Sequence, residues 1–245
     1  MSSDRKSAIW VGVLYIVASV AGVLTFVPLG SLQEGPGFLA NAASMENQVV
    51  MLVLLELTMA VTVAGVAFMV YPVLRRTADT PVREGLALWY VGTRITEGAT
   101  FVVAVLATLS LYSLSQEFAA AGAPDASYFQ TGGTVWLATA DYAFALGQSV
   151  FCIGALMFYY LLFQSKLVPR WLSVWGFIAA PLMFVASLSL VVTGDPNSTF
   201  STALYAPMGV QEMVLAVWLI LKGFNPAALA SPSATVSVAK GQLQD

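Results

Sequence analysis

Six long apolar runs are the feature that most restricts how this chain can fold. They cover residues 8–29, 48–74, 86–114, 136–163, 171–193 and 204–224. Each run is long enough to cross the hydrocarbon core of a bilayer as a helix, which takes roughly 20 residues. Only 9% of the residues are charged, whereas soluble domains carry about 25%. The sequence therefore predicts an all-α fold, a polytopic transmembrane helical bundle with six spans.

The cationic residues lie almost entirely on one side of this predicted topology. Nine of the ten flank the runs at the chain ends or in alternate connections: Arg5, Lys6, Arg75, Arg76, Arg83, Lys166, Arg170, Lys222 and Lys240. The other connections, including the predicted outer loops at 30–47 and 115–135, contain no Lys or Arg. Because cytoplasmic segments carry the excess of Lys and Arg, we expect both termini to be cytoplasmic and the protein to lie in the inner (plasma) membrane.

The chain divides into two predicted parts. Residues 1–224 are expected to form one six-helix transmembrane domain. Residues 225–245 contain Pro226, Pro232 and many small residues, a composition that buries too little apolar surface to fold. We expect this segment to be a disordered cytoplasmic tail.

Five ionisable residues lie inside the predicted spans, where charge is costly. They are Glu56, Arg94, Glu97, Asp141 and Glu212. A charge at the bilayer centre costs at least about 2.5–3.5 kcal/mol on insertion scales, so such residues face the bundle interior, pair with one another or stay protonated. These five residues are the candidates for binding a ligand or an ion.

Three of these candidates are expected to lie close together, because of their depth in the membrane and their helical spacing. At roughly 1.5 Å per residue, Glu97 and Glu212 fall near the middle of the membrane, with Arg94 one turn closer to the cytoplasm. Arg94 and Glu97 are three residues apart and share a helix face. Glu56 and Asp141 fall in the outer half. We expect Glu56 to complete the cluster, while a tilted helix would place Asp141 at the outer interface.

Four carboxylates face a single guanidinium in this prediction, so they cannot all be charged and dry. Either some of them are protonated or water enters from outside. Two interpretations remain open. One is a wet cavity that relays a proton, binds a cation or holds a polar ligand, and the other is a buried ion-pair network that only orients the helices.

Several kinds of chemistry lack the residues they need. The chain contains no histidine, which excludes His-based zinc sites and Ser-His-Asp triads. A carboxylate-only site for a hard cation is chemically possible, but the spacing of the acids does not demand one. We therefore assign no catalytic, cofactor-binding or metal-binding residues and expect no cofactor. The net charge of -3 is small and does not indicate nucleic-acid binding.

Three stretches carry a resemblance to a known family. They are residues 83–97 (REGLALWYVGTRITE), 169–177 (PRWLSVWGF) and 211–224 (QEMVLAVWLILKGF). With the spacing of the spans, they resemble the prokaryotic membrane-protein family catalogued as a domain of unknown function (number four-three-eight-six). The resemblance implies a bacterial or archaeal six-helix inner-membrane protein and supplies no catalytic residue to carry over.

Three functions are compatible with these residues, and all three require the lipid bilayer. The first is binding or transport of an ion, a proton or a small polar solute at the interior cluster. The second is a non-catalytic partner, scaffold or sensor subunit of a membrane complex, formed with another membrane protein or as a homo-oligomer. The third and least supported is an intramembrane enzyme that uses carboxylates as general acid and base.

Overall fold

The computed structural model describes residues 2–33, 37–121, 126–193 and 199–230, and every regular element within them is helical. In chain order these elements are α1 (Ser3–Gln33), α2 (Phe38–Ser44), α3 (Glu46–Thr77), α4 (Pro81–Ala120), α5 (Ala126–Ser165), α6 (Arg170–Thr193), α7 (Thr199–Leu221) and α8 (Pro226–Leu229). Six of them, α1 and α3–α7, are long and apolar enough to cross a membrane. The predicted all-α fold with six spans is confirmed in these terms, as expected of a multi-pass membrane protein.

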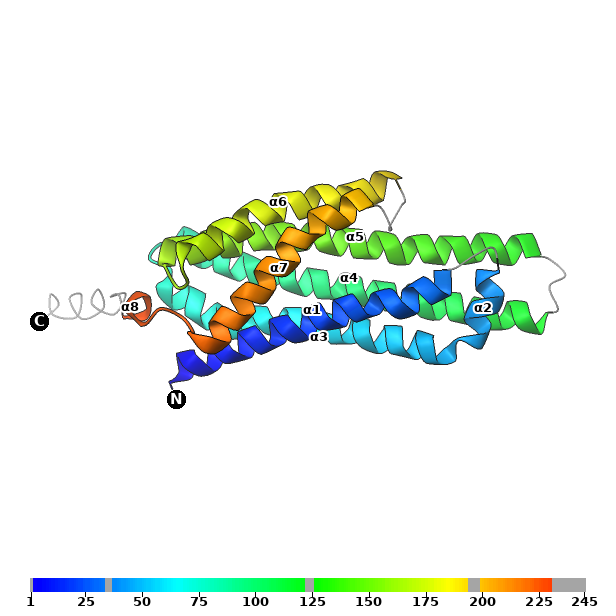
Figure 1. Cartoon of the computed structure of the whole chain (residues 1–245), viewed down its shortest axis with the longest axis horizontal. Helices are drawn as coiled ribbons and strands as arrows, with labels where there is room; N and C mark the ends of the chain where they lie inside the picture. The colour runs from blue at the N-terminus through cyan, green and yellow to red at the C-terminus, as the bar shows by residue number, and fades with distance from the viewer. Residues whose placement is uncertain (1, 34–36, 122–125, 194–198, 231–245) are drawn as a thin grey trace, which may run out of the picture.

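The six long helices form a closed ring. Each packs against the next long helix in the chain, from α1 through α3, α4, α5 and α6 to α7, and α7 returns to α1. Figure 1 shows α7 crossing the bundle beside α1 at an angle to its axis. Because every long helix has a neighbour on either side, each also has a face directed towards a shared interior.

The seam between α1 and α7, which closes the ring, is held at two places. At the first, a Cβ on Gly12 would lie 2.6 Å from the carbonyl oxygen of Ala216, so glycine lets the two backbones approach each other directly. At the second, the guanidinium of Arg5 donates to the carbonyls of Leu219 at 2.9 Å and Ile220 at 2.5 Å. These bonds satisfy carbonyl groups that a helix leaves free at its C-terminal end.

The helices extend further on one side of the bundle than the apolar runs predict. α4 and α5 have 40 residues each, or about 60 Å of helix at 1.5 Å per residue, against a hydrocarbon core of roughly 30 Å. The loops expected at 30–47 and 115–135 are therefore largely helical in their described parts, and α2 packs against α4 there (Figure 1). Alanine-rich sequence favours helix, and Gln116 secures the contact by donating to the carbonyl of Ala43 at 2.8 Å.

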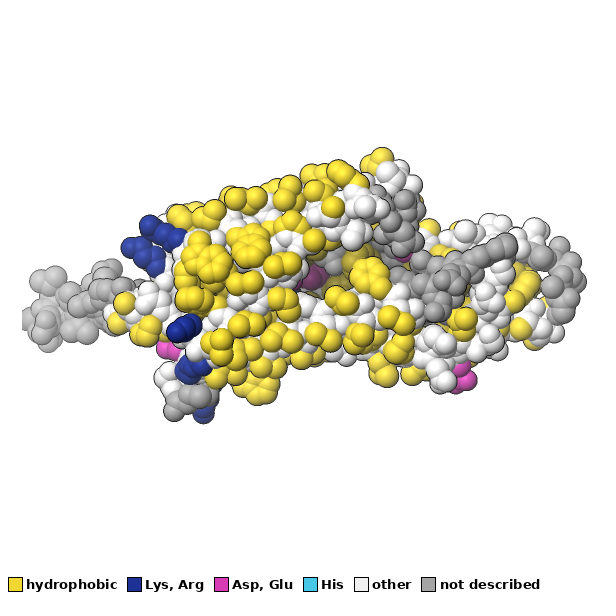
Figure 2. Space-filling model, viewed as in Figure 1, with side chains coloured by type: hydrophobic (Ala, Val, Ile, Leu, Met, Phe, Trp, Pro, Cys, Tyr) yellow, Lys and Arg dark blue, Asp and Glu magenta, His cyan; other side chains and the backbone are white. Residues whose placement is uncertain are grey.

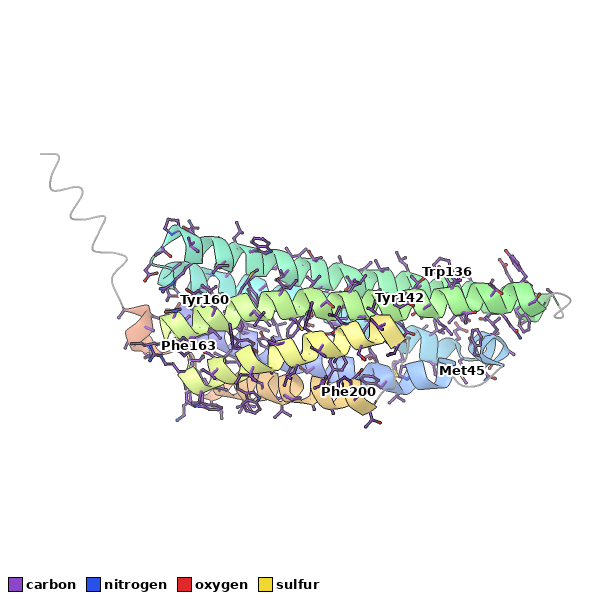
Figure 3. The ribbon with its side chains drawn as sticks, turned by 90° about the horizontal axis from the view of Figure 1, so that it is seen from above. Met45, Trp136, Tyr142, Tyr160, Phe163 and Phe200 are labelled. Atoms are coloured by element: carbon purple, nitrogen blue, oxygen red, sulfur yellow. The ribbon has the colours of Figure 1, made fainter. Side chains whose placement is uncertain are left out.

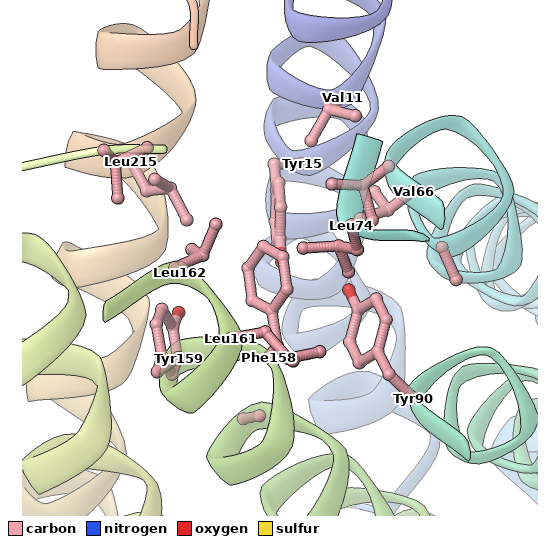
Figure 4. Packing of buried hydrophobic residues seen from close by; sticks show 14 of the residues in the cluster. Val11, Tyr15, Val66, Leu74, Tyr90, Phe158, Tyr159, Leu161, Leu162 and Leu215 are labelled. Atoms are coloured by element: carbon pink, nitrogen blue, oxygen red, sulfur yellow. The ribbon is translucent and has the colours of Figure 1, made fainter. Parts of the chain in front are cut away.

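The largest buried apolar cluster includes residues of all six long helices. Its biggest fully buried aromatic side chains are Tyr90, Phe158 and Tyr159, and it also includes Tyr15 (Figure 4). The rings of Tyr90 and Phe158 stack with their centroids 4.8 Å apart. Large apolar side chains also cover the outside of the bundle (Figure 2), among them Phe200, which points away from it (Figure 3). An apolar exterior of this kind is what a lipid-facing surface requires.

The cations gather at the end of the bundle where α1 begins and α7 ends, which we call the basic end (Figure 2). α8 lies at this same end (Figure 1), so the first and last described helices share one side of the bundle. α8 forms inside the predicted disordered tail and is capped by Asn225, whose side chain accepts from the backbone N–H of Ala227 at 3.1 Å. The rest of that predicted tail, residues 231–245, lies outside the described residues.

Candidate functional site

One face of α4 supplies the centre of the interior polar cluster. Tyr90, Arg94, Glu97 and Phe101 follow one another at intervals of four, three and four residues, which places them on one stripe of a helix. All four are at most 3% exposed. The charged pair therefore lies between two aromatic residues of the same buried stripe.

Arg94 has partners on three helices. Its Nη1 lies 2.9 Å from Oε2 of Glu97 one turn along α4, and its Nε donates to the carbonyl of Val63 in α3 at 3.4 Å. The guanidinium carbon also lies 4.9 Å from the centroid of the Phe151 ring of α5, within the range of a cation–π contact. Nη1 and Oε2 are close enough to attract electrostatically, yet neither has a partner in hydrogen-bonding geometry among the described residues.

Glu212 approaches the same guanidinium from α7. It interacts electrostatically with both Arg94 and Glu97. Its side chain is only partly buried, unlike those of the α4 pair, and the described residues give it no hydrogen bond and no carboxylate–cation contact within 4.0 Å. Arg94 is thus in direct contact with one acid and near a second that keeps some access to the surroundings.

Three buried tyrosines lie beside this group of charges, and sequence reasoning missed them. Tyr15 of α1, Tyr90 of α4 and Tyr159 of α5 belong to one buried cluster, in which Tyr90 and Tyr159 lie on either side of Phe158 (Figure 4). The hydroxyl of Tyr90 is buried without a hydrogen-bond partner among the described residues. No signal in the sequence marked them, because Tyr90 and Tyr159 lie four residues from the ends of the predicted spans 86–114 and 136–163, where interface tyrosines are common.

Tyr159 also begins a hydrogen-bonded chain to two further helices. Its hydroxyl lies 2.5 Å from Oε1 of Gln211 in α7. Gln211 in turn donates from Nε2 to the carbonyl of Leu172 in α6 at 3.1 Å. Gln211 is fully buried, so this chain fixes the rotation of α7 beside Glu212, the next residue.

The five sequence-predicted candidates divide into a cluster and two separate acids. Arg94 and Glu97 are in direct contact, and Glu212 lies within electrostatic range of both. Glu56 was expected to complete the cluster, but it lies seven residues, or about 10 Å of helix, from Val63, and the buried Oε2 of Glu56 has no hydrogen-bond partner among the described residues. Asp141 is ten residues before Phe151 in α5, about 15 Å along the helix. Neither acid is a described neighbour of Arg94.

The two sides of the cluster are packed differently. Towards the basic end, the largest apolar cluster closes the ring. Towards the opposite end, the described residues at 137–142 of α5 and 202–207 of α7 are all at least partly exposed. In Figure 2, acidic atoms are visible at the bottom of a hollow bordered by α1 and α7. A smaller buried apolar cluster that includes Met59, Val63 and Phe101 continues past the charges on this opposite side. The visible opening to the acidic atoms is therefore the lateral hollow between α1 and α7.

The residues present do not form a recognisable metal centre. Among the described residues, no group of three or more His, Cys, Asp and Glu side chains is placed to hold a metal ion. Cys152 is buried and unpaired, and small apolar packing is its expected role. The chemistry available to the cluster is therefore that of carboxylates, one guanidinium and phenol hydroxyls.

Comparison with known proteins places the chain in a family. No curated protein and no solved structure matches it. A family model matches residues 10–223, which extend from the first membrane-spanning helix to just beyond the end of the sixth and include every member of the polar cluster. The chain therefore belongs to the family described as "Domain of unknown function (DUF4386)".

Proposed function

We propose that this protein binds a proton or a small cation at Glu212, in the interior of a six-helix bundle of the inner membrane, and that this binding site serves transport or sensing of that ion. One observation carries the proposal. Arg94 already has Glu97 in direct contact, and Glu212 adds a second carboxylate beside them. The site thus has one more acid than it has cations to neutralise it.

The charge balance supports a positive ligand. With both acids ionised, the cluster of Arg94, Glu97 and Glu212 has a net charge of minus one in a medium where charge is expensive. A buried ion pair is tolerated when both charges are matched, whereas an uncompensated buried charge is strongly destabilising. A proton on Glu212, or a cation beside it, restores neutrality.

The packing around the cluster supports access that is not open to both ends of the bundle. The hollow in Figure 2 opens on the side of the bundle between α1 and α7, and the tyrosine-rich core closes the way to the basic end. A transporter needs such one-sided access, which must alternate between the two faces of the membrane. A sensor needs only the open side.

The proposal also includes the orientation of the bundle in the membrane. We infer that the basic end faces the cytoplasm, so that both termini are cytoplasmic, because Lys and Arg are retained on the cytoplasmic side of bacterial membranes. The partly exposed residues at 137–142 of α5 and 202–207 of α7 then lie towards the periplasm or the cell exterior. An ion that enters from that side would reach Glu212 before it met the tyrosine-rich core.

A thermal-shift experiment tests binding. The purified protein is unfolded in neutral detergent at constant ionic strength with Li⁺, Na⁺, K⁺, Mg²⁺ or Ca²⁺, against choline, and over a range of pH. A ligand at 100 times its Kd stabilises by about 2.7 kcal/mol, which corresponds to a shift on the order of 5 °C for a protein of this size. We expect one cation, or a lower pH, to give this shift in the wild type and in the control Glu46→Gln, but not in Glu212→Gln.

Flux into proteoliposomes separates transport from sensing. Vesicles carry a pH-sensitive or cation-sensitive dye, and valinomycin imposes a K⁺ diffusion potential. Uptake in the wild type that Glu212→Gln reduces by at least about tenfold establishes transport, and binding without uptake establishes sensing. If no cation or pH change distinguishes the wild type from Glu212→Gln in the unfolding assay, the proposal is rejected. The cluster then serves only to orient helices, and a partner or scaffold function remains.

A further inference from the structure

A cavity that is remote from the acidic cluster opens at the basic end. It has a volume of about 550 Å³ and lies between the α5–α6 turn and the segment that follows α7. Its wall includes Lys166, Arg170, Trp218, Lys222, Asn225 and Pro226. Three cations and no acid line it.

The three cations of the cavity wall have no acidic partner among the described residues. Most of the others are engaged: Arg75 with Glu84, Arg76 with Asp4, Arg83 with Asp79, and Arg5 with the carbonyls at the end of α7. Among the described residues, no carboxylate lies within 4.0 Å of Lys166, Arg170 or Lys222. The cavity wall therefore holds an unneutralised charge of plus three.

Lys166 is held in a conformation that a lysine rarely adopts. It has a φ of 56°, in the left-handed region that favours glycine because a Cβ is crowded there. Asn225 stabilises the turn by donating from Nδ2 to the carbonyl of Lys166 at 3.2 Å and from its backbone N–H to the carbonyl of Leu167 at 2.9 Å. A strained residue kept in place by its surroundings is a reason to look for a function, and here the retained side chain is a cation.

The guanidinium of Arg170 is positioned to bind an anion through its N–H edge. Its guanidinium carbon lies 5.0 Å from the centroid of the Phe163 ring. Stacking on an aromatic ring fixes the plane of a guanidinium while its N–H donors remain available, and this planar fork matches the oxygens of a phosphate. Arg170 is also the first residue of the 24-residue helix α6, whose N-terminal end adds partial positive charge to the same cavity.

We propose that this cavity binds the phosphate group of an anionic ligand, and its position indicates the headgroup of an anionic phospholipid. The neighbouring Trp171 is exposed and stacks with Trp175 at 6.4 Å between centroids. Tryptophan prefers the headgroup level of the bilayer, and basic pockets at the ends of membrane helices match lipid headgroups. This site does not depend on the acidic cluster and would bind its ligand whether or not Glu212 binds an ion.

Native mass spectrometry of the full chain tests the proposal. The protein is released from detergent with phosphatidylglycerol or phosphatidylcholine added at equal concentration, and separately with inorganic phosphate. We expect retained phosphatidylglycerol to exceed phosphatidylcholine severalfold in the wild type. Each of Arg170→Gln, Lys222→Gln and Lys166→Gly should lower that preference by about fivefold, the value expected for one cation near an anionic headgroup.

Two features of the design keep the result decisive. Lys166→Gly removes the cation and relieves the left-handed strain, so it should weaken lipid binding without loss of thermal stability. Arg75→Gln removes a cation of the same end that Glu84 already neutralises, and it should leave the preference unchanged.

The outcomes then separate cleanly. Phosphatidylglycerol binding without phosphate binding identifies a lipid site, and phosphate binding that the cavity variants abolish identifies a site for a soluble phosphate compound. Absence of both, or an equal loss of preference in Arg75→Gln, overturns the proposal in favour of unspecific attraction to the basic end.

Discussion

The guanidinium of Arg94 and the carboxylate of Glu97 lie 2.9 Å apart on one face of α4, with both side chains almost completely removed from solvent. Such a pair is stable only while both members are present, because the loss of either leaves an unmatched charge in a medium that does not solvate it. Glu212 makes the costs of the two losses unequal. It offers Arg94 a second carboxylate, but it does not offer Glu97 a second cation.

The first prediction concerns that asymmetry. Arg94→Gln leaves two acids without a cation and should lower the free energy of unfolding by about 3–5 kcal/mol, the range for breaking a buried pair. Glu97→Gln leaves Arg94 with Glu212 and should cost clearly less. The measurement is denaturant unfolding in detergent micelles. Equal losses for the two variants would mean that Glu212 does not act as a counter-ion of Arg94.

An exposed pair provides the control for this experiment. Arg75 and Glu84 are also 2.9 Å apart, but their side chains are 62% and 49% exposed. Solvent-exposed pairs contribute about 0–1 kcal/mol. Arg75→Gln should therefore change the unfolding free energy by less than about 1 kcal/mol under the same conditions.

The second prediction concerns the hydrogen-bonded chain from Tyr159 to Gln211. Tyr159→Phe removes the hydroxyl at 2.5 Å and leaves the buried Oε1 of Gln211 without that donor, which should cost about 1–3 kcal/mol. Tyr160→Phe is the matched control, because Tyr160 is the next residue, is 38% exposed and should tolerate the change. If both variants unfolded alike, the Tyr159–Gln211 bond would not contribute to the packing of α7.

The third prediction concerns the seam that closes the ring. Gly12→Ala forces a methyl group against the carbonyl of Ala216 and should separate α1 from α7, at a cost of about 1–3 kcal/mol for overpacking. Gly92→Ala introduces the same atom on α4 where nothing lies within 4 Å, and helix propensity makes it neutral or stabilising by up to about 1 kcal/mol. Thermal unfolding midpoints of the two variants should move in opposite directions or differ by several degrees. A Gly12→Ala protein as stable as Gly92→Ala would show that the seam can open without cost.

The fourth prediction concerns orientation in the membrane. Cys152 is the only cysteine and is buried, so Cys152→Ala provides a background free of thiols. In that background, Ser127→Cys at the start of α5 should react with a membrane-impermeant maleimide added to intact cells or spheroplasts. Ser2→Cys at the basic end should react only after the membrane is permeabilised. The reverse pattern would place the basic end outside the cell and contradict the proposed orientation.

Much of the architecture follows from the local sequence alone. Apolar runs of more than 20 residues leave the backbone no alternative to helix inside a bilayer, so the number of spans and the all-α fold were predictable. The placement of Arg94 beside Glu97 was also predictable, because residues three apart on a helix are neighbours wherever the helix lies. The gathering of Lys and Arg at one end follows from the same count of spans.

The sequence misjudged features that depend on contacts between helices. The segments at 30–47 and 115–135 looked like loops because they are polar and rich in small residues, but the described parts are largely helical, since α2, α4 and α5 pack against one another outside the apolar runs. Glu56, predicted in the outer half of its span, was expected to complete the cluster, because apolar composition and approximate depth do not reveal which way a helix is rotated. Tyr15, Tyr90 and Tyr159 carried no pattern that marked them as neighbours.

The sequence by itself thus determined how many helices are long and apolar enough to cross a membrane, which end is basic and which charges share a helix, because these properties depend on length, composition and a fixed helical period. Only the tertiary structure decided which acid on another helix meets Arg94. That choice depends on the rotation and height of each helix in the ring, which are set by contacts such as Gly12 against Ala216 and Tyr159 against Gln211. These contacts join residues about 50 to 200 positions apart, so no local pattern records them.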